Sequence, residues 1–170
     1  MSKWRALIPV LLSTYVVGCQ DQAVTKQEVI ETPAASEQAL PSKGEMPSEG
    51  EKTESLFVDK LRPGMSEEEI SNLFGRDFTL VENAMDGTET WRYDKGKKEN
   101  YAFDDQGIDK VDLEGLMAGK IEALLFIDWT EAGLVRSAAL FLLDVEQEGM
   151  YREYHIDEEG NLEELVRSFK

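Results

Sequence analysis

The stretch LRPGMSEEEISNLFG, residues 61–75, carries the strongest structural signal in the chain. Pro63-Gly64 predicts a turn, and Ser66 with Glu69 three residues later forms the S-x-x-E capping box that begins many helices. Apolar residues then recur at helical spacing, and Gly75 can end the helix with a positive φ. We therefore predict a short amphipathic helix here, and the apolar residues of 56–61 can form another short helix that packs beside it.

Beyond residue 75 the apolar period changes from 3.6 to 2, which indicates strands. Asp86-Gly87 favours a tight hairpin turn between the first two of them, and the glycines of 104–119 leave that stretch unassigned. The segments with strand character are 78–81, 90–93, 101–103, 120–130, 134–145, 151–157 and 162–169. We predict an α+β fold, in which one or two short N-terminal helices pack on an antiparallel β-sheet of several hairpins.

The first 19 residues, MSKWRALIPVLLSTYVVGC, have the pattern of an export signal. Two basic residues precede an apolar run that is too short to span a bilayer, for which about 20 apolar residues are needed. The last four residues resemble the lipobox of bacterial lipoproteins, in which the Cys is diacylated and becomes the new N-terminus. This resemblance predicts that Cys19, the only Cys of the chain, is the site of lipidation.

The composition divides the rest of the chain into two parts. Residues 20–54 contain eight acids, three prolines and no aromatic residue, which predicts a disordered acidic tether. Residues 56–170 are rich enough in apolar and aromatic side chains to form a core, and we expect them to be the folded domain. The predicted order is a signal peptide at 1–19, a tether at 20–54 and an α+β domain at 56–170.

Charge and composition exclude several functional classes. The chain has 35 acids and 18 bases, a formal net charge of −17, and this argues against nucleic acid as a partner, since phosphates attract clustered Lys and Arg. A single Cys and a single His exclude a Cys-rich zinc site and most arrangements of histidines around a metal. No serine of the domain has a G-x-S-x-G setting. We expect neither enzymatic activity nor a cofactor.

The central hairpin, 120–130 with 134–145, is apolar on both faces. In one interpretation the helices cover one face, and the other face curls upon itself or is covered by residues 104–119, as is usual for a central strand. In the other interpretation an apolar groove is open to a partner. If the groove is open, aromatic and aliphatic side chains would supply most of the binding energy. The candidate partner-binding residues are Trp91, Leu124, Phe126, Leu140 and Leu142.

The segment 104–119 also holds the only candidate cation site of the domain. Its acids are Asp104, Asp105, Asp109, Asp112 and Glu114, whose carboxylates are the ligand type that Ca²⁺ prefers. Their spacing does not match the calcium loop D-x-[DN]-x-[DN]-G-x₅-E. A solvated acidic loop is the favoured interpretation, and a calcium site is the alternative.

The run KLRPGMSEEEISNLFG, followed by a strand and then TETWRYD, resembles the SmpA/OmlA family. The best-known member of that family is the small lipoprotein of the outer-membrane β-barrel assembly machine. The chain has Arg76-Asp77 where the family usually has Pro, and its C-terminal half is longer. The matching positions are Gly64, Met65, Ser66, Ile70, Phe74, Gly75, Trp91 and Tyr93.

The resemblance implies a fold, similar also to that of the β-lactamase-inhibitor proteins, that serves protein binding rather than catalysis. Long hairpins and a long acidic tether look more like lipoproteins of Gram-positive bacteria that reuse this domain, and such a cell has no outer membrane for a barrel-assembly role.

We therefore expect a lipoprotein of the cell envelope, attached to the membrane through Cys19 on its extracytoplasmic face. In a Gram-negative organism this membrane would be the outer membrane. The domain would act as a non-catalytic protein-binding module for another envelope protein. The alternatives are a lipoprotein that senses a ligand or Ca²⁺, and a subunit of the β-barrel assembly machine.

Overall fold

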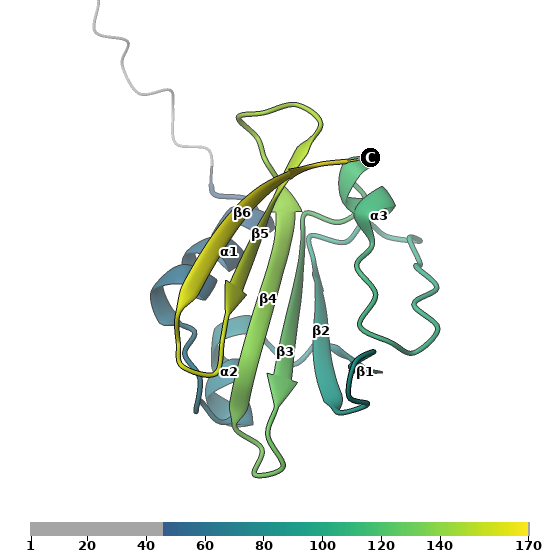
Figure 1. Ribbon diagram of the computed structural model, residues 1–170. Helices are drawn as coiled ribbons and strands as arrows, with labels where there is room; N and C mark the ends of the chain where they lie inside the picture. The colour runs from purple at the N-terminus through teal and green to yellow at the C-terminus, as the bar shows by residue number, and fades with distance from the viewer. Residues whose placement is uncertain (1–45, 170) are drawn as a thin grey trace, which may run out of the picture. The chain divides into compact units, whose positions relative to one another are not determined.

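The computed structural model describes residues 46–169, which form a six-stranded antiparallel sheet with three helices (Figure 1). Each strand pairs with the strand that precedes it in the sequence, so the order across the sheet is β1-β2-β3-β4-β5-β6. The strands are β1 (Thr79–Glu82), β2 (Glu89–Lys95), β3 (Ala123–Trp129), β4 (Val135–Leu143), β5 (Met150–Ile156) and β6 (Leu162–Ser168). The predicted combination of helices with an antiparallel sheet of several hairpins is confirmed in this coarse form.

Helix α1 (Glu49–Lys60) begins seven residues before the predicted start of the domain at residue 56. The Ser48 side chain accepts a hydrogen bond from the Glu51 amide at 3.1 Å, and the Glu51 carboxylate accepts one from the Ser48 amide at 2.7 Å. This capping box satisfies amides that the first turn of a helix leaves unpaired. The predicted tether at 20–54 therefore extends too far, because its acidic composition masked a helix start at Ser48.

The start of α1 also contacts the sheet. The Gly50 amide donates to the Glu122 carboxylate at 2.9 Å, just before β3 begins. A Cβ at Gly50 would lie 3.3 Å from the Cβ and the backbone oxygen of Glu122, so the helix packs closely against this residue. The residues before 56 are thus part of the packed domain.

Helix α2 (Glu67–Phe74) confirms the helix predicted from the 61–75 stretch. Ser66 and Glu69 form the expected capping box, and Gly75 follows with φ of 88°. The helices α1 and α2 lie on the same side of the sheet (Figure 1). Their buried side chains Phe57, Leu61, Ile70 and Phe74 join the core on that face.

The sheet has an apolar cluster on each face. On the α1/α2 face, Ala123, Leu125, Ile127 and Trp129 of β3 pack with the helices. On the other face, Leu124 and Phe126 pack with Leu116 and Ile121. Ile121 precedes β3 and joins the second cluster, although strict alternation places it with Ala123 on the first face.

The second face is covered by the segment that the sequence left unassigned. Residues 101–103 form no strand, and the short helix α3 (Leu113–Met117) follows them. Asp112 caps α3 by accepting from the Gly115 amide at 2.8 Å, and it also accepts from the Tyr101 hydroxyl at 2.7 Å. These bonds hold Leu116, Val111 and Leu113 against the sheet. Of the two interpretations of this face, the covered one is therefore correct.

Candidate functional site

The five candidate partner-binding residues lie in the core and do not form a surface. Leu124 and Leu140 are fully buried, and none of the five is more than 5% exposed. They also lie on different faces, since Leu124 and Phe126 belong to the α3 side. Trp91, Leu140 and Leu142 belong to the helix α1/α2 side. The prediction of an apolar groove built from these residues is wrong, because α3 and its flanking loop occupy the face that was expected to be open.

The acids of the 104–119 segment point to separate partners within the chain. Asp105 pairs with Arg92, Asp109 accepts from the Ala84 amide at 2.9 Å, and Asp112 caps α3. Asp104 accepts from the Gln106 amide at 3.2 Å. Residues 46–169 hold no group of three or more acidic, His or Cys side chains arranged to bind a metal ion. Turn, cap and ion-pair contacts therefore account for Asp104, Asp105, Asp109 and Asp112, four of the five acids that were considered for calcium.

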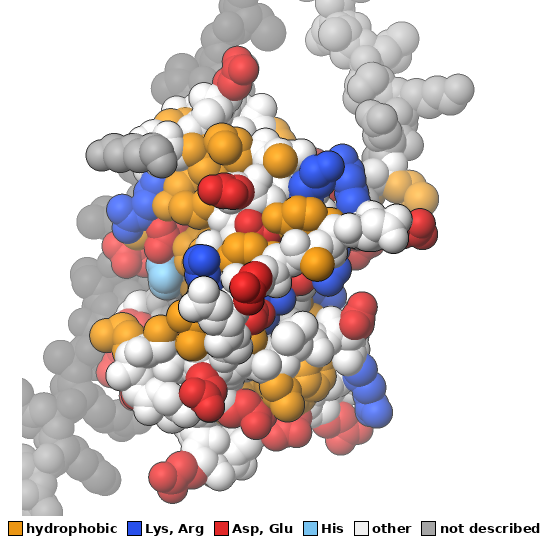
Figure 2. All heavy atoms as spheres, turned by 90° about the vertical axis from the view of Figure 1, so that its right-hand side faces the viewer, with side chains coloured by type: hydrophobic (Ala, Val, Ile, Leu, Met, Phe, Trp, Pro, Cys, Tyr) orange, Lys and Arg blue, Asp and Glu red, His pale blue; other side chains and the backbone are white. Residues whose placement is uncertain are grey.

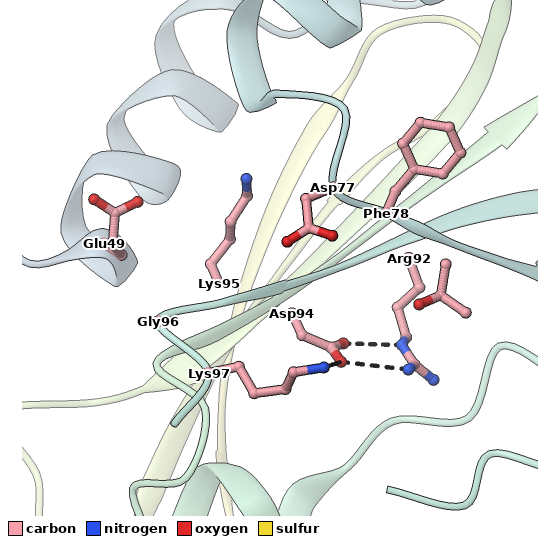
Figure 3. A pocket seen from close by; sticks show the side chains of 9 residues that line it. Glu49, Asp77, Phe78, Arg92, Asp94, Lys95, Gly96 and Lys97 are labelled. Atoms are coloured by element: carbon pink, nitrogen blue, oxygen red, sulfur yellow. Dashed lines mark hydrogen bonds and ion pairs between the residues drawn. The ribbon is translucent and has the colours of Figure 1, made fainter. Parts of the chain in front are cut away.

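A charged cleft of about 350 Å³ lies beside the end of β2 (Figure 3). The Arg92 guanidinium at its floor is only 6% exposed and pairs with Asp94 at 2.9 Å and with Asp105. Lys97 pairs with the second oxygen of Asp94 at 3.3 Å. Two cations of this cleft, Arg92 and Lys97, are thus already paired with acids of the same chain.

Lys95 lines the same cleft and is held by the fold. Its Nζ donates to the Phe74 carbonyl at the end of α2 and lies 4.8 Å from the centre of the Tyr93 ring. Burial lowers the pKa of Lys95, while Glu49 and Asp77 oppose this effect. A cation at the last carbonyls of a helix stabilises that helix end. We interpret the cleft as a structural junction between α2 and β2.

The two edges of the sheet differ in how their backbone groups are paired. At the end of β1, the Asn83 amide donates to the Thr88 carbonyl across the hairpin. Because bonded and non-bonded pairs alternate, the amide and carbonyl of the preceding residue, Glu82, point away from β2. The Glu82 amide donates to the Gly107 carbonyl at 2.8 Å, and the Glu82 carbonyl accepts from the Asp109 amide at 3.0 Å. The loop before α3 therefore closes part of this edge.

The β6 edge is open in the part of the chain that the structure describes. Bonded pairs occur at both ends of the β5–β6 hairpin, Gly149 with Phe169 and Asp157 with Asn161. Bonded and non-bonded pairs alternate along an antiparallel ladder. The residues whose amides and carbonyls point away from β5 are therefore Leu162, Glu164, Val166 and Ser168. No described residue forms a backbone hydrogen bond with these outward groups.

Exposed apolar side chains accompany this open edge. Leu162 and Val166 are 44% and 43% exposed, and β6 is exposed along most of its length. On the side of the molecule that carries β1, charged side chains interrupt the apolar patches (Figure 2), and Leu80 of β1 is itself 57% exposed. An exposed strand edge of this length is a template for another strand, and proteins usually shield such edges with charge, a bulge or a covering segment.

Charged side chains decorate β6 without blocking its edge. Glu153 of β5 accepts from Arg167 Nε and from His155 Nε2, both at 2.5 Å. Burial tends to raise the pKa of Glu153, but the hydrogen bonds and charges of His155 and Arg167 together outweigh it and lower this pKa. Glu163 is exposed and forms no ion pair among residues 46–169. Strand β6 thus presents an acid, Glu163, and a base, Arg167, on the same face, four residues apart.

No motif in the sequence of β6 marks this strand as a candidate site. The hairpin of 151–157 with 162–169 was predicted correctly, but no site was assigned to it. One signal could have pointed to β6: it is the last strand in a series of hairpins, and the last strand lies at the sheet edge when strands pair in sequence order. The sequence alone does not show that the strands pair in this order.

Cys19 lies outside the described residues, as do the whole predicted signal peptide and most of the predicted tether. Within residues 46–169, no helix has the length and apolar character that crossing a bilayer requires. Comparisons of the chain with protein-family models, with curated proteins and with solved structures found no match.

Proposed function

We propose that this protein is a lipid-anchored module of the cell envelope that binds protein by adding a strand to the β6 edge. The observation that supports this proposal is a row of amides and carbonyls that point away from β5 and have no backbone partner among the described residues. They belong to Leu162, Glu164, Val166 and Ser168. Strand addition satisfies such groups with main-chain hydrogen bonds, and neighbouring side chains supply selectivity. Leu162 and Val166 would provide the apolar contacts. The function is binding, without a catalytic step.

The proposed anchor is acylation of Cys19 on the extracytoplasmic side of the membrane. Its support is the sequence: a basic start, a short apolar run and the only Cys at the expected cleavage point. More than one acyl chain gives stable attachment, whereas a single chain binds only marginally. Mass spectrometry of the mature N-terminal peptide tests the anchor, and an unmodified Cys19 in the mature protein would refute it.

We also propose that the domain is related to the SmpA/OmlA family. What supports this is that the motif residues pack as one unit. Ile70 and Phe74 of α2 are buried, Phe74 lies 6.0 Å from Tyr93 between ring centres, and the Tyr93 hydroxyl donates to the Gly75 carbonyl at 3.2 Å. Residues matched by a family motif are expected to contact one another when the motif specifies a fold. A role in barrel assembly requires more than this likeness and forms no part of the proposal.

The β6 proposal is tested with the matched variants Val166→Pro and Val166→Thr in the full chain. Proline removes the outward amide of Val166, and an edge strand tolerates it because that amide makes no bond to β5. Threonine keeps both the amide and the β-branched shape. A photoactivatable cross-linker at Ser168 in intact cells then reports the neighbours of β6.

We expect the cross-linked products to persist in Val166→Thr and to fall strongly in Val166→Pro. Circular dichroism of both purified variants controls for folding. Equal products from the two variants, with both folded, would overturn strand addition at β6 and leave the lipid anchor as a separate question.

A further inference from the structure

Strand β6 carries opposite charges at equal distances from its central residue, and this bears on what can pair with its edge. Its odd-numbered residues Glu163, Leu165 and Arg167 share one face of the sheet, opposite the α1/α2 side. Leu165 stands at the centre, with the acid two residues before it and the base two residues after it. A strand with this pattern is complementary to an antiparallel copy of itself.

We propose that the strand that adds to β6 is β6 of a second copy of this chain, in the register that places Leu165 opposite Leu165 of the other copy. This inference rests on the proposed function and names its partner. In this register Glu163 of one copy lies opposite Arg167 of the other, and the same pair recurs across the two-fold axis. Opposite charges in directly facing positions stabilise a strand pair.

The backbone groups agree with this register. Two antiparallel strands bond only where the outward-pointing residues of both face each other. With Leu165 at the axis, Glu164 faces Val166 and Leu162 faces Ser168, and these are the residues whose amides and carbonyls point away from β5. Every outward group of β6 thus gains a partner.

The neighbouring symmetric registers are less favourable because of charge. An axis at Glu163 or at Glu164 places two carboxylates opposite each other, and an axis at Arg167 places two guanidinium groups opposite each other. Like charges in facing positions destabilise a strand pair. An axis at Val166 leaves Arg167 facing Leu165, without an ion pair. Of these axes, only the one at Leu165 places Glu163 opposite Arg167, and it leaves Glu164 facing Val166.

The two-fold axis of such a pair is perpendicular to the continuous sheet, which keeps like faces together. The helices α1 and α2 of both copies then lie on one side of the joined sheet, since they cover the same face in each (Figure 1). The chain therefore enters both domains, at Ser48, from the same side. This arrangement suits two copies anchored in one membrane, where confinement raises the effective concentration and a small interface suffices.

The test is disulfide cross-linking of Leu165→Cys in the full chain, in intact cells under mild oxidation. Directly facing residues of a non-bonded antiparallel pair have Cα atoms about 4.5 Å apart, which a disulfide spans. Val166→Cys is the matched control, because its counterpart is shifted along the strand to a Cα distance beyond about 7 Å, which a disulfide does not span. We expect a covalent dimer from Leu165→Cys and at least a several-fold weaker one from Val166→Cys.

Charge exchange tests the register independently of folding. In the Leu165→Cys background, Glu163→Arg or Arg167→Glu alone places like charges opposite each other, and we expect dimer yield to fall roughly tenfold. Co-expression of the two variants, one of them with a size tag, pairs Arg with Glu at both positions and should restore the dimer as a mixed species. Restoration excludes misfolding as the cause of the loss.

The outcomes separate this inference from the proposed function. No dimer from Leu165→Cys, equal dimer from Val166→Cys, or no response to charge exchange would each overturn self-pairing. Cross-linking of Leu165→Cys to a different protein would also overturn it, while leaving strand addition at β6 intact. A dimer formed by the unaltered chain through Cys19 would instead contradict the proposed acylation, since an acylated thiol forms no disulfide.

Discussion

The Tyr154 hydroxyl donates to the Glu54 carboxylate at 2.7 Å, joining β5 to α1 across 100 residues of sequence. Arg152, on the same strand, pairs with Glu54 at 2.6 Å. Burial raises the pKa of Tyr154 above its ordinary value, and the hydrogen bonds to Glu54 and Glu164 raise it further. Glu54 therefore serves as the attachment of α1 to the C-terminal half of the sheet.

We expect Glu54→Ala to lower the free energy of unfolding by about 1–3 kcal/mol, because it removes the carboxylate partner of Arg152 and one of the two acceptors of the Tyr154 hydroxyl. The measurement is urea unfolding monitored by tryptophan fluorescence. Glu131→Ala, in an exposed turn, is the control and should change stability by less than about 0.5 kcal/mol. Equal effects of the two substitutions would contradict the role given to Glu54.

A chain that starts at residue 56 should be less stable than one that starts at residue 46. The shorter chain lacks the Ser48 cap, the Gly50 contact to Glu122 and the Glu54 pair, and it exposes the surface that buries Thr53. Loss of a cap costs about 1 kcal/mol, and loss of an ion pair or a buried hydrogen bond costs a similar amount each. We expect a deficit of at least about 3 kcal/mol by urea unfolding. Coincident unfolding curves would restore the boundary at residue 56.

The Asp112 carboxylate should stabilise the packing of α3 and its flanking loop on the sheet. It is 1% exposed and accepts hydrogen bonds from Tyr101 and from the Gly115 amide. We expect Asp112→Ala to cost about 1–3 kcal/mol, since both donors lose their acceptor. Hydrogen exchange should rise first at Leu116 and its neighbours, while exchange in β4 remains slow. Uniform acceleration across the sheet would show that α3 is not a separately opening unit.

Asp86 gives the domain a defined response to acid. Hydrogen bonds from the Thr88 side chain and amide, with one from Arg136, lower the pKa of Asp86 to about 2. The unfolded chain binds this proton near the ordinary value of 3.8, so the stabilisation is complete above that pH and is lost as the pH falls toward 2. The difference in urea midpoint between the wild-type chain and Asp86→Asn should therefore shrink between pH 4 and pH 2. A constant difference over this range would contradict the assignment.

Local signals in the sequence predicted local structure well, and the arrangement of the strands decided the rest. The capping box at Ser66 and the hairpins after residue 120 were predicted because a few adjacent residues determine them. The second capping box, at Ser48, has the same S-x-x-E spacing but stands in a polar, acidic stretch, where composition suggested disorder. Local spacing was the better guide there than average composition.

The candidate site could not be predicted for a different reason. Whether Leu124 and Phe126 face solvent depends on where residues 101–121 fold back, and no periodic pattern in that segment indicates this. The open edge at β6 depends on the pairing order of all six strands. Both are long-range properties, which the alternation of apolar residues within one strand does not contain.

Substitution of Phe126 distinguishes a role in the core from a role in partner binding. It is 5% exposed and packs edge-to-face on Phe141 with ring centres 5.9 Å apart, beneath the α3 cover. Phe126→Ala should destabilise the domain by about 3–5 kcal/mol, from lost burial and the cavity that remains. Leu80→Ala is the control, since Leu80 is 57% exposed and its truncation should cost less than about 1 kcal/mol. If Phe126→Ala leaves the urea midpoint unchanged, then this side chain does not pack in the core, and the α3-side face would again be a candidate surface for a partner.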